Sequence, residues 1–433
     1  MAIQTLLIII AVLAVLLVIG VPITYAIGIS ALSAIIGSVA FDVSVFTAAQ
    51  RTFVGMSSFS LTAIPFFILA GNLMNQGGIA KRLVNFVLAL LGKLPGSLLV
   101  TNVGANALFG AISGSASAAA AAVGSMVKEG EEEQNYDVAL CAATNGASAP
   151  AGLLIPPSNA LITYSLVSGG TSVAALFMAG YIPGLIWALA CAIVTVFLAS
   201  RKGYRGQTGR FSWSTLGIAT LQALPSLSLI IVVIGGIIAG VFTATEGSAV
   251  SVVYALILSI LYRNIDLKKF WNIVIDSAKM SAMVVFLIGV SNILGWVMSF
   301  TMIPQAISSV LLGLTNNPVI ILLIMNVILL ISGTFMDVTP AILIFTPLFL
   351  PIVMTFGMHP VHFGLILVYN LCIGNITPPV GNTLFVAIKV GKSSLSKVIP
   401  YMLVYYIAIL VGLILVTYIP AVSTGLPALA GLL

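Results

Sequence analysis

The chain has 433 residues, of which 60% are hydrophobic and only 6% are charged. A soluble domain carries about 25% charged residues, so this composition excludes an ordinary water-soluble fold and indicates an all-α polytopic protein of the lipid bilayer. The formal net charge of +6 does not indicate nucleic-acid binding, because the basic residues lie at the ends of apolar segments, where they set membrane topology.

The first part of the chain, residues 1–210, contains apolar segments long enough to cross a hydrocarbon core of about 30 Å. Its hairpin is expected to enter and leave from the cytoplasm. The predicted elements are scaffold and arm helices within 1–95 with spans at 4–20, 22–40 and 60–76, a re-entrant hairpin at 96–127, a broken helix at 137–169 and a helix at 172–199.

The second part, residues 211–433, is predicted to repeat this plan upside down, with a hairpin that enters from outside. Together the two parts contain about ten transmembrane helices and two re-entrant hairpins. Mixed charged and apolar segments at 41–56, 79–92 and 266–278 indicate interfacial helices. The elements of the second part are scaffold helices within 218–300 with spans at 218–242, 245–262 and 280–300, a hairpin at 318–353, a broken helix at 361–391 and a last helix at 398–418.

The basic residues fix the orientation of these elements. One topology places all of the 16 Lys and Arg residues except Arg51 on the cytoplasmic side, as expected from the positive-inside rule. It gives a multi-pass membrane protein with both termini outside. The cytoplasmic residues are then Lys81, Arg82, Lys93, Lys128, Arg201, Lys202, Arg205, Arg210, Arg263, Lys268, Lys269, Lys279, Lys389, Lys392 and Lys397.

Two kinds of interruption occur once in each part. A Ser-Gly break separates the two arms of each hairpin, at Ile112–Ser117 and at Ile331–Asp337. A Pro-Pro pair then breaks the following helix, at Pro156-Pro157 and at Pro378-Pro379. The recurrence of both features in the same order predicts two inverted structural repeats, one in each part of the chain.

These breaks indicate a binding site. Proline removes a backbone donor and prevents a straight helix, and freed backbone groups in a membrane must lie in protein or line a wet cavity. Interrupted helices at matching places in inverted repeats indicate the substrate site of a transporter. Unwound carbonyls and hydroxyls can coordinate Na⁺, and helix N-termini can face an anionic group. Alternatively, Ser, Gly and Ala at these places only allow close helix packing.

The chain resembles the large membrane (M) subunit of tripartite ATP-independent periplasmic (TRAP) transporters, of the DctM and SiaM type. The resemblance covers essentially the whole chain. It rests on the segments Ala63–Gly71, Ser113–Ser117, Gly152–Ser158, Gly240–Glu246, Ser332–Pro340 and Gly374–Asn382.

This resemblance implies a sodium-driven elevator mechanism, in which the hairpins and broken helices form a mobile transport domain and the other helices form a scaffold. It also implies a place in the bacterial inner membrane, with both termini in the periplasm. The implied partners are a small membrane Q subunit on a separate chain and a periplasmic substrate-binding protein, the P subunit. The cargo is expected to be an organic acid such as sialic acid or a C4-dicarboxylate, with Na⁺ as coupling ion and no organic cofactor.

The repeats place the expected sites residue by residue. One Na⁺ is expected between the first hairpin and the first broken helix, and another at the matching place in the second part. The expected Na⁺ ligands are Ser113, Gly114, Ser115, Asn145 and Gly152 at the first site, and Ser332, Gly333, Thr334, Gly374 and Thr377 at the second. The expected substrate-binding residues are Ser115, Ser117, Ser158, Asn159, Asp337 and Asn382.

The acidic residues have several interpretations. Asp337, at a hairpin tip, could complete an ion site, bind a substrate hydroxyl or ammonium group, carry a proton, or cap a helix, since an intramembrane carboxylate is usually functional. Glu246 is expected to cap a helix. The acidic segment from Glu129 to Asp137 is expected to be a solvated cytoplasmic loop.

The sequence is also compatible with functions other than Na⁺-coupled uptake with a binding protein. An ion-coupled anion carrier that needs no binding protein, a channel, and a passive assembly subunit remain alternatives. The chain contains neither a phosphate-binding P-loop nor a His-Glu-x-x-His motif nor paired intramembrane aspartates, so we expect neither ATP hydrolysis nor another enzymatic activity.

Overall fold

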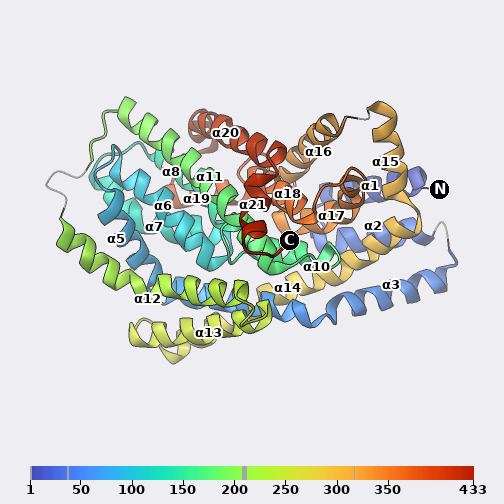
Figure 1. Ribbon diagram of the computed structural model, residues 1–433, viewed down its shortest axis with the longest axis horizontal. Helices are drawn as coiled ribbons and strands as arrows, with labels where there is room; N and C mark the ends of the chain where they lie inside the picture. The colour runs from blue at the N-terminus through green and yellow to red at the C-terminus, as the bar shows by residue number, and fades with distance from the viewer. Residues whose placement is uncertain (1, 37–38, 207–211, 316) are drawn as a thin grey trace.

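The structure is a computed structural model that describes residues 2–36, 39–206, 212–315 and 317–433. Within these residues the fold is helical and contains no β-strand (Figure 1). The predicted boundary between the two parts of the chain, at 210/211, lies outside the described residues, as does Arg210. The division into two repeats therefore stays a prediction.

The described residues form the helices drawn in Figure 1. The helices of the first part are α1 (Ala2–Val18), α2 (Ile23–Ile36), α3 (Phe41–Met56), the 3₁₀ turn η1 (Phe59–Thr62), α4 (Ala63–Gln76), α5 (Ile79–Leu91), α6 (Ser97–Ser113), α7 (Ala116–Glu133), α8 (Val138–Ser148), α9 (Ala151–Leu154), α10 (Asn159–Val167) and α11 (Val173–Arg201). Those of the second part are α12 (Trp213–Ile238), α13 (Ala244–Leu261), α14 (Leu267–Phe300), α15 (Ile303–Leu314), α16 (Pro318–Gly333), α17 (Val338–Thr355), α18 (Pro360–Gly374), α19 (Asn382–Gly391), α20 (Leu395–Tyr418) and α21 (Ala421–Leu429).

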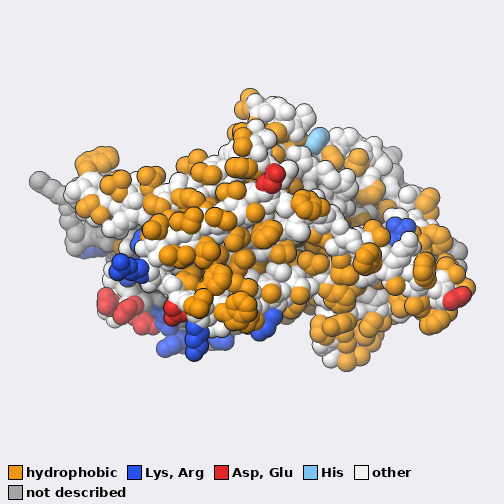
Figure 2. All heavy atoms as spheres, turned by 90° about the horizontal axis from the view of Figure 1, so that it is seen from below, with side chains coloured by type: hydrophobic (Ala, Val, Ile, Leu, Met, Phe, Trp, Pro, Cys, Tyr) orange, Lys and Arg blue, Asp and Glu red, His pale blue; other side chains and the backbone are white. Residues whose placement is uncertain are grey.

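The polytopic character predicted from composition is confirmed. Six helices in the described residues are long and apolar enough to cross a membrane, and two pairs of shorter helices would each form one bent span. Helix α1 has 17 residues, as many as the span expected at 4–20. Helix α2, at 14 residues, is shorter than the span expected at 22–40, of which residues 37 and 38 lie outside the described part of the chain. Figure 2 shows apolar side chains over most of one face, with Lys and Arg side chains gathered toward one end.

Capping residues define many helix starts. Ser115, Asp137 and Ser158 accept backbone N–H bonds at the starts of α7, α8 and α10, which satisfies donors that a helix leaves free. Thr243 and Glu246 form a reciprocal capping box at α13: Glu246 Oε2 accepts from Thr243 N at 2.8 Å, and Thr243 Oγ1 accepts from Glu246 N at 3.2 Å. The expected capping role of Glu246 is confirmed.

The hairpins and broken helices lie where the Ser-Gly and Pro-Pro motifs predicted them. The first hairpin is α6 and α7, and the second is α16 and α17. The first broken helix is α8, α9 and α10, whose two arms are bent by 47°. The second is α18 and α19, separated by residues 375–381. Both Pro-Pro peptide bonds are cis.

Three predicted details are wrong. The expected interfacial helix at 266–278 and span at 280–300 are one continuous helix, α14, of 34 residues. This segment contains no proline and only one short run of charges, so nothing ends the helix between its two parts. The helices α15 and α21 were not predicted.

The third error concerns the acidic segment. Helix α7 continues to Glu133, and Glu131 is buried, with 6% of its surface exposed. Asp137 caps α8 and forms an ion pair, with Lys202 Nζ 2.6 Å from Asp137 Oδ2. Tyr401 OH donates to the same carboxylate oxygen at 2.7 Å. This carboxylate therefore joins the start of α8 to the end of α11 and the start of α20.

Another cluster joins the α4/α5 junction to the α13/α14 junction. Lys269 Nζ donates to Gln76 O at 2.9 Å, Asn264 Nδ2 donates to Gly77 O at 3.1 Å, and the Arg82 guanidinium lies 3.3 Å from the centre of the Tyr262 ring. Helix ends that the predicted topology assigns to one side of the membrane thus contact each other.

Helix ends that the predicted topology assigns to the opposite side of the membrane also contact each other. Tyr164 OH donates to Pro360 O at 2.6 Å, joining α10 to the start of α18. Tyr418 OH donates to Val319 O at 3.1 Å, joining the end of α20 to α16. The short helix α21 packs on α11 and α18.

Long helices flank the hairpins and broken helices. Helix α14 packs on α2, α3 and α4, and α4 also packs on α13. In Figure 1, α12, α13, α14 and α3 lie along one long side of the molecule, while α6–α10 and α17–α19 occupy its middle. Between the flanking helices and this middle group, α4 packs on α6 and α10, and α14 packs on α17.

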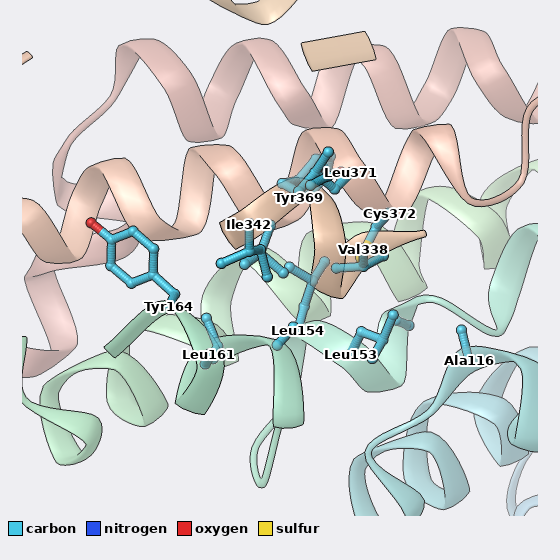
Figure 3. Close-up of a cluster of buried hydrophobic side chains, with 14 of the residues drawn as sticks. Ala116, Leu153, Leu154, Leu161, Tyr164, Val338, Ile342, Tyr369, Leu371 and Cys372 are labelled. Atoms are coloured by element: carbon cyan, nitrogen blue, oxygen red, sulfur yellow. The ribbon is translucent and has the colours of Figure 1, made fainter. Parts of the chain in front are cut away.

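An apolar core connects the two halves beneath the hairpin turns. Figure 3 shows Leu153 and Leu154 of α9 facing Val338 and Ile342 of α17 and Leu371 of α18. All five side chains are at most 7% exposed. Burial of this apolar surface holds the first broken helix against the second hairpin.

Glycine pairs hold each hairpin against a broken helix. A Cβ built on Gly152 of α9 would lie 2.2 Å from Gly110 Cα of α6, and one built on Gly374 of α18 would lie 2.4 Å from Gly333 C of α16. Only glycine permits this backbone approach. The pairs occupy matching places in the two parts of the chain, and each brings a hairpin turn close to a break.

We predict that Gly152→Ala destabilises the protein, because the added methyl group would meet backbone atoms of α6, and overpacking of this kind costs about 1–3 kcal/mol. The measurement is the melting temperature in detergent. Gly235→Ala on α12 is the control, since nothing lies within 4 Å of its Cβ position, and it should leave the melting temperature unchanged or raise it. Equal melting temperatures for both variants would contradict the tight contact.

Candidate functional site

The two hairpin turns present short polar side chains at helix N-termini. In the first turn Gly114 ends α6 with φ +63°, a conformation that favours glycine, and Ser115 Oγ accepts from Ala118 N at 3.3 Å. In the second turn Thr334 follows α16, and Asp337 Oδ1 accepts from Val338 N at 2.9 Å. Asp337 is therefore a helix cap, which was one of its predicted roles.

Both turns and both breaks line one cavity of about 200 Å³, which we call the tip cavity. Five polar residues of its wall lie at or beside the turns and breaks. They are Ser115 and Ser117 from the first turn, Asn159 after the first break, Asp337 from the second turn and Asn375 at the end of α18. Residues more than 200 positions apart in sequence are thereby brought together.

Three helices begin at the tip cavity. The first residues of α7, α10 and α17 all line it, as Ala116, Asn159 and Val338. A helix N-terminus carries partial positive charge and free N–H groups, so it favours an anion. Among the described residues of the lining, Asp337 alone carries a formal charge. The cavity therefore combines dipoles that attract an anion with one carboxylate that repels it.

The polar atoms of the cavity are only partly used within the protein. The Ser115 and Ser117 hydroxyls are 3.2 Å apart. Asn159 Nδ2 donates to Gly114 O at 3.5 Å, while its Oδ1 is buried and has no hydrogen-bond partner among the described residues. The Asp337 side chain is exposed to the cavity, and Asn382 lies beside its carboxylate. A buried acceptor without a partner is costly, so Asn159 is suited to bind a ligand.

The oxygens near the turns are neutral and suit an alkali cation. Ser113 Oγ lies 3.4 Å from Ser115 O, and Thr334 O accepts from Val380 N at 3.1 Å, so the second turn contacts its break directly. Thr377 Oγ1 donates to Ile373 O at 2.7 Å. Hydroxyl and carbonyl oxygens without a thiolate or imidazole are the donor set that hard cations take.

Several predicted site residues lie outside the tip cavity. Ser158 is buried, and its hydroxyl donates to Leu153 O and accepts from Leu161 N at 3.3 Å, so it supports the break. Gly152, Gly333 and Gly374 make the glycine contacts described above. Ser332, Thr334 and Thr377 lie near the second turn and break but are not in the lining.

Asn145 belongs to a second polar cluster deeper in the first hairpin. Its Nδ2 donates to Ala120 O at 2.8 Å, and its Oδ1 accepts from Asn106 Nδ2 at 3.0 Å. The Asn106 amide also contacts Asn102 Oδ1 at 2.7 Å and Ser148 Oγ at 2.9 Å. The spacing of Asn102 and Asn106, four residues apart in an apolar helix, was a signal of this cluster that our sequence interpretation missed.

Other lining residues were missed as well. Asn375, Thr339 and Thr163 line the tip cavity but were not predicted to bind ligand. Asn375 lies within the Gly374–Asn382 motif, so the motif indicated this residue. Thr339 lies in the first turn of α17 and Thr163 in the second turn of α10, and neither position has a sequence signal.

The remaining wall of the tip cavity is apolar. Ile64 and Ile68 of α4 and Met280 and Val284 of α14 complete the lining. Between these two helices Asn72 Nδ2 donates to Ser277 Oγ at 2.9 Å, outside the lining, and to Met280 Sδ at 3.9 Å. All of the polar lining comes from the hairpins and broken helices, and the flanking helices contribute hydrocarbon side chains.

The sequence matches the family model described as "Tripartite ATP-independent periplasmic transporter, DctM component" over residues 10–422. It is 50% identical over 416 residues to the uncharacterized protein YgiK of Salmonella typhimurium, covering 96% of this chain and 95% of that protein. It is 36% identical over 440 residues to the C4-dicarboxylate TRAP transporter large permease protein DctM of Rhodobacter capsulatus, covering 98% and 99%.

A fused relative and a solved structure extend the comparison. The isethionate TRAP transporter permease protein DctMQ of Oleidesulfovibrio alaskensis is 39% identical over 409 residues, which are 94% of this chain and 64% of that protein. The structure of the YdaH transporter of Alcanivorax borkumensis has a TM-score of 0.66 at 13% identity, covering 87% of this chain and 88% of that one, and so shares the fold. The chain belongs to the DctM family, the large permease component of TRAP transporters.

Proposed function

We propose that this permease takes up an organic acid by Na⁺ symport, with the tip cavity as its substrate site. The observation that carries the proposal is the convergence of both hairpin turns and both breaks on that cavity, with three helix N-termini and an unpaired Asn159 Oδ1. Such half-helix ends at a buried cavity suit a carboxylate substrate and alkali ions.

The balance of charge in the site favours coupling to a cation. A carboxylate in the tip cavity would face Asp337, and two like charges in a protein interior repel strongly. Na⁺ bound at the neutral oxygens near Ser113–Ser115 and Ser332–Thr334 would offset this repulsion. Binding of the acid would therefore depend on prior binding of Na⁺.

The apolar wall supports an elevator. The hairpins and broken helices would move as a transport domain along α4 and α14, which form the scaffold in this proposal. Because the wall facing the site consists of Ile64, Ile68, Met280 and Val284, movement along it would break no hydrogen bond of the lining. A channel would need no such division into a polar and an apolar wall.

The partners follow from the family. The TRAP family implies a periplasmic substrate-binding protein that delivers the acid. This chain covers 64% of the DctMQ relative, and we propose that a Q subunit acts together with the permease. A carrier that works without a binding protein is the second candidate, and omission of the binding protein tests it.

The decisive experiment is reconstitution of the permease with its candidate Q subunit and binding protein in liposomes. Uptake of a panel of acids, including sialic acid and C4-dicarboxylates, is measured with and without an inward Na⁺ gradient. Saturable uptake that requires the gradient and the binding protein supports the proposal. Uptake that is driven by ATP without Na⁺ would overturn it.

We predict that Ser115→Ala and Thr334→Val each raise the Na⁺ concentration for half-maximal uptake about tenfold, because a hydrogen-bond-like contact to a charged group is worth about 1.5–3 kcal/mol. Ser125→Ala is the control, since Ser125 lies on α7 outside the tip cavity and its hydroxyl donates to Ala122 O. Unchanged Na⁺ dependence in both test variants would count against the two ion sites.

We predict that Asp337 selects acids that carry a hydroxyl group. A carboxylate can accept a hydrogen bond from a substrate hydroxyl, and a site built for this contact discriminates against the analogue that lacks it. Competition by malate and succinate, which differ by one hydroxyl, measures the preference. Asp337→Asn should reduce the preference for malate over succinate at least tenfold. If malate and succinate compete equally well in the parent protein, this role of Asp337 is refuted.

A further inference from the structure

A second cavity, of about 440 Å³, lies next to the tip cavity. It is lined on one side by α3 and α14 and on the other by α10 and α17, and we call it the Arg51 cavity. Its wall contains one charged residue, one tryptophan and several short polar residues, which are Arg51, Trp296, Ser58, Ser291, Asn292 and Ser299. Its volume is in the range of small-molecule sites.

The two cavities are neighbouring parts of one cleft. On α14, Val284 lines the tip cavity and Ile288 lines the Arg51 cavity; on α17 the corresponding residues are Thr339 and Leu343. Each step is four residues, or about 6 Å along a helix. On α10 the step from Thr163 to Leu166 is shorter still. A molecule in the Arg51 cavity is thus one helical turn from the proposed substrate site.

Arg51 gives this cavity a positive charge. Its guanidinium lies 5.6 Å from the centre of the Trp296 ring, a contact that orients the group while its N–H donors stay available. Within the described residues no carboxylate forms an ion pair with Arg51. A guanidinium with free donors binds carboxylate and sulfonate groups, which accept two parallel hydrogen bonds.

The remaining polar wall also suits a small anion. Asn292 is exposed to the cavity, and its Nδ2 makes one hydrogen bond, to Ile288 O at 3.2 Å. Ser58 and Ser299 are exposed as well. No Asp or Glu is found among the described residues that line this cavity, whereas the tip cavity contains Asp337. Along the cleft the charge therefore changes from positive to negative.

We propose that the Arg51 cavity is a capture site, where the anionic group of the organic acid binds before it reaches the tip cavity. Arg51 holds the carboxylate or sulfonate, and Trp296 positions the guanidinium. The anion then moves one turn along α10, α14 and α17 as Na⁺ offsets Asp337. The role in transport rests on the proposed function, but the attraction of anions does not.

The attraction is tested by thiol labelling of the full-length protein in detergent. The chain has three cysteines, Cys141, Cys191 and Cys372, and all are buried, so an Asn292→Cys variant has little background. Its reaction rates are measured with two methanethiosulfonate reagents of similar size, one with a sulfonate and one with a trimethylammonium group. We expect the anionic reagent to react faster.

Arg51→Gln in this background should lower the ratio of anionic to cationic rates about tenfold, the lower end of the effect of a local charge on encounter rates. Rising salt should lower the ratio in the parent protein and have little effect in the variant. Arg263→Gln, which removes an equal charge from the α13/α14 junction, is the control and should leave the ratio unchanged. Ser299→Cys offers a second reporter position should Asn292→Cys fold poorly.

An unchanged ratio in Arg51→Gln at either reporter position would overturn the capture site. In the reconstituted system the same substitution should raise KM for the acid about tenfold and leave the maximal rate and the Na⁺ dependence unchanged. If Na⁺-dependent uptake is absent in the parent protein while labelling responds to Arg51, the proposed function fails and the anion site stands. If uptake is normal but its KM does not respond to Arg51, the capture role is refuted.

Discussion

Backbone groups freed by a helix break cannot face lipid, and this constraint governs the centre of the structure. Two helices break at Pro-Pro pairs and two hairpins turn at Ser-Gly motifs. The second break is held by the second hairpin through the bond from Val380 N to Thr334 O, and glycine allows the close approach of a hairpin to a break, as between Gly110 and Gly152. The tip cavity is the polar space that remains between these interrupted segments.

The cleft combines two ways of attracting an anion. In the tip cavity the attraction comes from the N-termini of α7, α10 and α17, which carry only partial charges and are opposed by Asp337. In the Arg51 cavity it comes from a full charge at the side of an aromatic ring. A site with a full positive charge would bind an acid tightly and release it slowly, whereas a site of dipoles and removable cations loses its affinity when the cations leave.

The sequence predicted the local features of the fold better than the tertiary ones. Pro-Pro and Ser-Gly motifs act on their own backbone, so the hairpins and broken helices were found near their true bounds. The continuity of α14 was missed because Lys268 to Lys279 resemble an interfacial segment, although helix propagation needs only the absence of a breaker. The burial of Glu131 and the position of Thr339 in the cavity depend on packing between distant segments. Ser158 shows the reverse case, since a residue in a predicted site motif supports the break from inside.

The length of α14 has a consequence for the surrounding lipid. A continuous helix of 34 residues is about 51 Å long, far more than the hydrocarbon core of about 30 Å. Its last 21 residues, Met280–Phe300, carry no charge and match that core, while Lys268, Lys269 and Lys279 hold its first third among the headgroups. Since no proline allows a sharp bend, the helix must tilt to keep its first part among the headgroups, or the bilayer must thicken around it. Bilayer thickness would then set the angle of the wall that faces the substrate, so the lipid composition of the membrane becomes a variable of transport.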